Sequence, residues 1–116
     1  MARCKVSYKI NDESFDILGI KKDNTLTFME NDIKFKINIK ENDVELIREN
    51  NEYKLKIILS NDAHATYELK NVNVGKLNID IKLLKLDIKD HSIKAKYKLD
   101  DALFNLDLKY EVIKWL

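Results

Sequence analysis

The segment Ile33-Lys34-Phe35-Lys36-Ile37-Asn38-Ile39 alternates apolar and polar side chains at every position. Successive side chains of a β-strand point to opposite faces, so this pattern gives a strand one apolar face and one polar face. The segment follows Asn31-Asp32 and precedes Glu41-Asn42-Asp43, which are residue types that favour turns. It therefore predicts a half-buried strand between two turns.

The same alternation extends in both directions from this segment. Towards the N-terminus the apolar positions are Cys4, Val6, Tyr8 and Ile10, then Phe15 and Ile17, which precede a break at Gly19, then Leu26 and Phe28. Towards the C-terminus they are Val44 and Leu46, with Arg48 in the same phase, then Tyr53, Leu55, Ile57 and Leu59, then Ala63, Ala65, Tyr67 and Leu69. The last segments carry Ile93, Ala95, Tyr97 and Leu99, then Phe104, Leu106, Leu108, Tyr110 and Val112. No window has the 3.6-residue period of a helix.

The longest alternating segment runs from Leu77 to Ile88. Its apolar phase changes at Leu83-Leu84, which predicts a β-bulge or a sharp bend at that point.

The short segment from Ile113 to Leu116 is out of phase with the strand before it. Two alternatives remain for this tail and for Trp115: an outward apolar patch used for self-association, shared with Ile47 and Ile58, or a plug over one end of the barrel.

Short connections between these segments predict hairpins, and therefore an antiparallel meander. Each strand has an apolar face that must be covered, and curling the sheet into a barrel covers it and removes exposed edges. We expect an all-β fold without a helix: a closed antiparallel meander barrel of about 8 to 10 strands. Strands of five to eight residues are too short for a membrane barrel.

The chain has 116 residues, which is the size of one domain, so we expect a single barrel domain over residues 1–116. A net charge of +1 gives no overall field for nucleic acid or for an anionic membrane. The N-terminal residues lack the apolar core of a signal peptide, and the only cysteine, Cys4, cannot form an internal disulfide. We therefore expect a cytoplasmic protein.

Four short stretches, in this order and spacing, resemble the YwiB-like family of small bacterial proteins. They are Val44-Glu45-Leu46-Ile47-Arg48, Ala65-Thr66-Tyr67, Gly75-Lys76-Leu77 and Ile93-Lys94-Ala95-Lys96-Tyr97. The resemblance covers nearly the whole chain and implies a calycin-type barrel, the shape of lipocalins and fatty-acid-binding proteins. It implies no catalytic residue. Members commonly have a Thr-Pro-Tyr-Gly-like turn, whereas this chain has Asn73-Val74-Gly75, in which only the glycine matches.

All five tyrosines and Arg48 fall in phase with the apolar positions. Inside a barrel, tyrosine hydroxyls and a guanidinium could form a polar patch in a cavity, with Arg48 pairing a carboxylate or a phosphate. Small residues on the same face, namely Gly19, Ala63, Ala65 and Ala95, would leave room for a ligand. The alternative is a filled barrel in which the tyrosine rings belong to the core and Arg48 reaches into solvent at the rim.

Other residues give weaker indications of chemistry. His64 falls on the outward face and His91 in a turn, without the spacing of a metal site, and the sequence has no catalytic or nucleotide-binding motif. We expect no enzyme, no metal and no cofactor. Outward lysines could track phosphates, or could face carboxylates on neighbouring strands. These lysines are Lys34, Lys36, Lys40, Lys54, Lys56, Lys94, Lys96 and Lys98.

The sequence therefore predicts a non-catalytic binding module that holds a small amphipathic or anionic ligand inside the barrel. Its candidate site residues are Arg48, Tyr53, Tyr67 and Tyr97. The alternative is a protein-protein interaction or structural domain with a filled barrel, with a homodimer among its possible assemblies, and nucleic-acid binding ranks third. No membrane partner is expected.

Overall fold

The computed structural model describes residues 1–73 and 75–116, and all of the regular structure in them is β-strand. The strands are β1 (Ala2–Ile10), β2 (Glu13–Lys22), β3 (Thr25–Glu30), β4 (Ile33–Ile39), β5 (Val44–Glu49), β6 (Tyr53–Leu59), β7 (His64–Leu69), β8 (Lys76–Ile79), β9 (Ile81–Lys89), β10 (Ser92–Leu99) and β11 (Ala102–Trp115). The all-β prediction is confirmed. The described residues contain no helix that is long and apolar enough to span a membrane.

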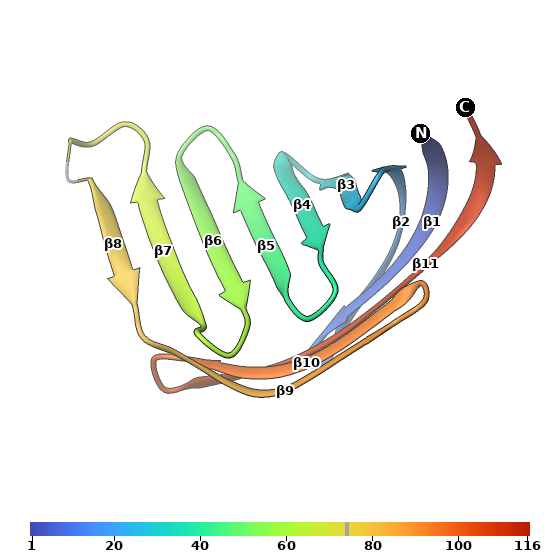
Figure 1. The fold of residues 1–116 in the computed structure, drawn as a ribbon. Coiled ribbons are helices and arrows are strands. Elements are labelled where there is room, and N and C mark those ends of the chain that lie inside the picture. The colour runs from blue at the N-terminus through green and yellow to red at the C-terminus, as the bar shows by residue number, and fades with distance from the viewer. Residues whose placement is uncertain (74) are drawn as a thin grey trace.

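The strands form one antiparallel sheet in the order β8-β7-β6-β5-β4-β3-β2-β1-β11-β10-β9. Every strand is paired with its neighbour in sequence except β8 and β9, and β1 pairs with β11, so the two chain ends lie together. In Figure 1, β4 to β8 stand side by side while β9, β10 and β11 cross beneath them. This is the predicted meander curled into a barrel, with one difference: it is not fully closed, because β8 and β9 are left as the two edges.

The sheet has 11 strands, more than the 8 to 10 expected. The segment predicted as the longest strand is divided at Asp80 into β8 and β9, and these two pair with strands at opposite ends of the sheet. The predicted bulge is present, because Lys85 and Leu83 face consecutive residues of β10 and Leu84 is the extra residue. The longest strand is instead β11, with 14 residues.

The predicted break at Gly19 is wrong, because β2 continues through this residue to Lys22. The glycine is buried between Cys4 and Phe28 of the neighbouring strands. A Cβ atom there would lie 2.9 Å from the carbonyl oxygen of Thr27 and 3.1 Å from Cγ2 of Val6. The space that Gly19 was expected to leave is therefore already filled, and the glycine allows β1, β2 and β3 to pack closely.

The C-terminal tail does not plug the barrel. It continues β11, with Trp115 paired with Ala2, and the amide of Leu116 donates to the carbonyl oxygen of Met1 at 2.9 Å. Trp115 is 72% exposed, so its ring lies outside the core.

Asparagine and aspartate form most of the tight hairpin turns, as their clusters predicted. Asn11, Asp23, Asn31 and Asp100 have positive φ angles, which these residue types tolerate better than most. The turn Asn73-Val74-Gly75 includes Val74, which lies outside the described residues; Gly75 has a φ of 72°.

The core is the inner surface of the barrel, and it follows the predicted alternation. Its buried residues are Ala2, Cys4, Val6, Leu26, Phe28, Phe35, Ile37, Val44, Ile57, Leu59, Ala65, Ile93, Ala95, Tyr97, Leu106 and Leu108. Nearly all of them are apolar, so burial of this surface supplies the main drive for folding.

Candidate functional site

A small pocket of about 130 Å³ lies inside the barrel, between β4, β5 and β6 on one side and β1, β10 and β11 on the other. Apolar and aromatic side chains form most of its wall, and polar groups come from Arg48, Tyr8 and Tyr97. The lining residues are Tyr8, Ile10, Phe35, Ile37, Leu46, Ile47, Arg48, Leu55, Ile57, Tyr97, Leu99 and Phe104. Sites for drug-sized ligands occupy roughly 300 to 1,000 Å³, so only a compact group fits here.

Arg48 lies at the mouth of this pocket. Its partners across the sheet are Phe35 and Leu55, which both face the barrel interior, so its backbone position is inward as predicted. Its guanidinium lies 5.5 Å from the ring centroid of Phe35, within the range of a cation-π interaction. The side chain is nevertheless exposed, so the charge is available to solvent and to an anion.

Two tyrosines bring hydroxyl groups to the same pocket. Tyr97 is only 3% exposed, and burial raises its pKa well above the ordinary value, with the nearby phenol of Tyr8 adding to the rise. Burial raises the pKa of Tyr8 to about 12, and the charge of Arg48 opposes part of that rise. Both phenols are therefore neutral at physiological pH and can donate a hydrogen bond.

The hydroxyls of Tyr8 and Tyr97 form no hydrogen bond with the part of the chain that the structure describes. Neither oxygen is among the fully buried polar atoms that lack a partner in the described chain, so both hydroxyls reach accessible space. A donor and an acceptor position thus remain free at each phenol beside the pocket.

Stacked aromatic rings fix the walls of the pocket. Tyr8 packs against Phe28 at 5.9 Å and Phe35 at 5.7 Å between ring centroids, and Phe28 stacks on Phe35 at 5.0 Å. On the opposite side Tyr97 stacks on Phe104 at 5.5 Å. These contacts restrict the positions of the two phenols.

The four candidate residues are divided by the structure into two pairs. Arg48 and Tyr97 line the pocket, whereas Tyr53 and Tyr67 stack on each other at 5.6 Å on β6 and β7 and do not line it. Tyr8, Phe35 and Phe104 line the pocket but were not among the candidates. Their inward phase was visible in the sequence, but the pairing of β1 with β11, which brings Tyr8 towards β10, was not.

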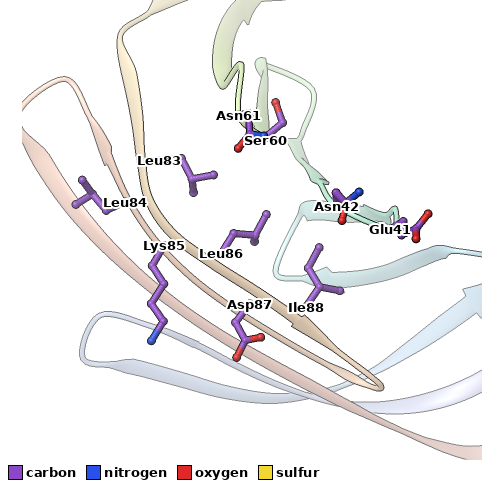
Figure 2. A pocket seen from close by; sticks show the side chains of 10 residues that line it. All are labelled: Glu41, Asn42, Ser60, Asn61, Leu83, Leu84, Lys85, Leu86, Asp87 and Ile88. Carbon is purple, nitrogen blue, oxygen red and sulfur yellow. The ribbon is translucent and has the colours of Figure 1, made fainter.

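A second, wider hollow lies at the seam of the barrel and has a volume of about 640 Å³. Figure 2 shows Leu83, Leu86 and Ile88 of β9 directed towards two turns, one with Glu41 and Asn42 and the other with Ser60 and Asn61. This seam groove shares no lining residue with the interior pocket.

The remaining candidates for chemistry are scattered. His64 and His91 are both exposed, and His91 packs beside the ring of Tyr110 at 4.8 Å between centroids. The Cys4 thiol is buried, and burial raises its pKa, which disfavours the reactive thiolate. No group of three or more possible metal ligands occurs in residues 1–73 and 75–116.

No protein-family model and no curated protein matches the chain. Among solved structures, it is similar to the crystal structure of the YwiB protein from Bacillus subtilis, with a TM-score of 0.60 and 18% sequence identity. The match covers 97% of this chain and 91% of that chain. The chain has a YwiB-like fold. At this level of identity the similarity concerns the fold alone, so the case for a function depends on the site.

Proposed function

We propose that this protein is a non-catalytic binding module that holds one compact amphipathic anion in the barrel. The apolar part of the ligand occupies the interior pocket, and its carboxylate or phosphate pairs with Arg48 at the mouth. The observation that carries the proposal is the meeting of an exposed guanidinium with an apolar cavity that contains two phenols without hydrogen-bond partners in the described chain.

The size of the pocket limits the ligand class. A cavity of about 150 Å³ engineered into a protein core takes a molecule the size of benzene. A pocket of about 130 Å³ therefore suits a single ring or a short branched chain. A long fatty acid does not fit, so the ligand is smaller than those of the lipocalins.

The chemistry of Arg48 suits an anion. A guanidinium can pair both oxygens of a carboxylate, and its face can remain stacked on Phe35 at the same time. The phenols of Tyr8 and Tyr97 line the same pocket, where they can bond a hydroxyl or carbonyl group of the ligand. A binding barrel of this design is consistent with a calycin-type relationship, and the single buried cysteine is consistent with a bacterial cytoplasmic protein.

The test is an amide chemical-shift titration with benzoate, isobutyrate, phenyl phosphate and inorganic phosphate. We expect saturable shifts at Leu55, Leu99 and Phe104 with the ring or branched anions, with dissociation constants of roughly micromolar to millimolar for such small ligands. Benzoate and phenyl phosphate distinguish a carboxylate from a phosphate headgroup. Inorganic phosphate, which has no apolar part, is expected to bind more weakly.

R48M is the decisive variant because methionine keeps an apolar stem beside Phe35 and removes the charge. We expect affinity to fall about tenfold, which is about 1.4 kcal/mol. K56M is the matched control, since Lys56 belongs to an ion pair with Glu45 on the outer surface. Absence of saturable shifts in the pocket with every anion, or equal affinity of wild type and R48M, would overturn the proposal.

The second candidate function is a protein-protein interaction, and exposed apolar residues of β2 and β11 favour it. Large apolar side chains are exposed there, with Leu18 at 61%, Ile113 at 55% and Trp115 at 72%. Sedimentation of wild type and a W115S/I113S variant tests it, because only a dimer built on this surface would dissociate in the variant.

A further inference from the structure

No strand is paired with the outer edge of β9 in the part of the chain that the structure describes. β9 pairs with β10 along its length, and β8, which precedes it across Asp80, pairs with β7 at the other end of the sheet. Figure 1 shows the chain leaving the lower end of β8 and turning into β9, which runs beneath the other strands. An edge of this kind presents backbone N–H and C=O groups that another strand can pair with.

The seam groove runs along this free edge. Leu83, Leu86 and Ile88 form its apolar side, and the polar turns at Glu41-Asn42 and Ser60-Asn61 form the other (Figure 2). Six residues of β9, from Leu83 to Ile88, line the groove, which corresponds to about 20 Å of extended chain. The groove thus has the length of a short β-strand.

Charges on the outer surface of the barrel mostly alternate between neighbouring strands. Across β4 to β8 one row reads Lys34, Glu49, Lys54, Glu68 and Lys76, each directly opposite the next. A second row on the other side of the barrel reads Lys9, Asp107, Lys94 and Asp87. Among the lysines expected on these outer faces, Lys34, Lys54 and Lys94 therefore lie directly opposite carboxylates.

The edge beside the seam groove departs from this alternation. On β9 and β10, Lys82 lies opposite Lys98, and Lys85 lies opposite Lys96. The only other directly opposed like charges in paired strands of the described residues are Arg3 and Lys114, at the chain ends. None of the four lysines of this block forms an ion pair with a described residue. Like charges in such pairs destabilise a sheet, so the block is a cost without a partner inside the chain.

We propose that the free edge of β9 binds an extended segment of a partner protein in which acidic residues alternate with apolar ones. Paired as an added strand, its acidic side chains lie outward beside Lys82 and Lys85 and continue the alternation seen elsewhere. Its apolar side chains point inward against Leu83, Leu86 and Ile88. The backbone supplies pairing, and the lysine block supplies the selectivity.

A second copy of this chain and a nucleic acid could also occupy this edge, and its side chains argue against both. The outer face of β9 carries Lys82, Lys85 and Lys89 against one carboxylate, Asp87, so two copies of this edge repel each other. Nucleic-acid binders usually add aromatic side chains to their lysines, and the outward positions of β9 and β10 carry none.

The test uses the full chain and two synthetic peptides, acetyl-(Glu-Val)₄-amide and acetyl-(Lys-Val)₄-amide. We expect the glutamate peptide to bind at least tenfold more tightly than the lysine peptide, with amide protection from hydrogen exchange appearing along β9. Reversing two charges of the block, in K85E/K96E, should invert this preference. K36E is the control, because Lys36 lies on the outer face of β4 away from the seam. K85Q/K96Q, which should abolish the preference, replaces the reversal variant if that variant does not fold.

Three results would overturn the proposal. The first is equal binding of the two peptides by the wild-type protein, and the second is protection at strands other than β9. The third is protection of β9 that requires only a higher concentration of the protein itself or added oligothymidylate, which would assign the edge to a second copy or to nucleic acid.

Discussion

The carbonyl oxygen of Thr27 lies 2.9 Å from the place that a Cβ atom on Gly19 would occupy. A methyl group at this position must push against backbone, because the contact is not with a side chain that can rotate away. We therefore expect G19A to lower the free energy of unfolding by roughly 1 to 3 kcal/mol, the usual cost of overpacking a core. Urea unfolding followed by far-UV circular dichroism of the sheet measures this change.

L18A, at the preceding position, is the control for G19A. Leu18 is 61% exposed, so its truncation should change stability by about 0.5 kcal/mol or less. If G19A were as stable as wild type, the close approach of β2 and β3 would be softer than the structure indicates.

Local alternation predicted which side chains face inward, because successive side chains of a strand point to opposite faces and only one face is buried. The inward positions Phe35, Ile37 and Leu106 are buried as expected. The phase change at Leu83-Leu84 predicted the bulge for the same reason.

What alternation could not predict is where a strand ends without a change of phase. Leu77, Ile79, Ile81 and Leu83 keep one phase across Asp80, yet β8 and β9 pair with strands at opposite ends of the sheet. The interior pocket could not be predicted for the same reason. Its lining depends on which strands meet when the sheet curls, and the whole chain determines these meetings. The pairing of Tyr53 with Tyr67 and the separate grouping of Tyr8 with Tyr97 and Arg48 follow from this closure.

The ion pair between Glu49 and Lys70 predicts a small dependence of stability on acid. Their charged atoms lie 2.7 Å apart, and the hydrogen bond from Lys70 lowers the pKa of Glu49 in the folded protein. A lowered pKa contributes stability above the pKa of the unfolded chain, and this contribution is lost as the pH falls through the folded pKa. Because both side chains are partly exposed, the contribution is about 0.5 kcal/mol.

E49Q should therefore lose less stability than wild type when the pH is lowered from 6 to 3. At pH 3 the two proteins should have similar stability. E52Q is the matched control, since Glu52 forms no ion pair with the described residues. Thermal melts at half-unit pH intervals provide the measurement, and an identical acid slope in wild type and E49Q would contradict this assignment.

The buried thiol of Cys4 provides a probe of global unfolding. The side chain has no exposed surface and packs between β11 and β2, so a thiol reagent reaches it only when the strands separate. We expect the native protein to react with a disulfide reagent at a rate limited by opening of the barrel, and to react at once in denaturing urea. Fast labelling of the native protein, at the rate of a free cysteine, would show that the β1 and β11 closure opens locally.

The phenol of Tyr8 predicts a loss of stability in alkali. Its pKa is raised to about 12 in the folded protein, chiefly by burial, whereas an unfolded tyrosine titrates near 10. A raised pKa means that the folded state holds the proton more tightly, so its contribution is complete below pH 10 and is lost as the pH rises towards 12. Two pH units correspond to roughly 2 to 3 kcal/mol.

Y8F lacks this titration and should lose less stability than wild type between pH 10 and 12, as measured by urea unfolding at each pH. Repeating the series in 1 M NaCl separates this effect from general charge repulsion, because salt screens repulsion between exposed charges but leaves the cost of ionising a buried phenol. Parallel pH slopes for wild type and Y8F in both salt conditions would mean that the Tyr8 hydroxyl is hydrated in solution, and that the interior pocket is wetter than its apolar walls suggest.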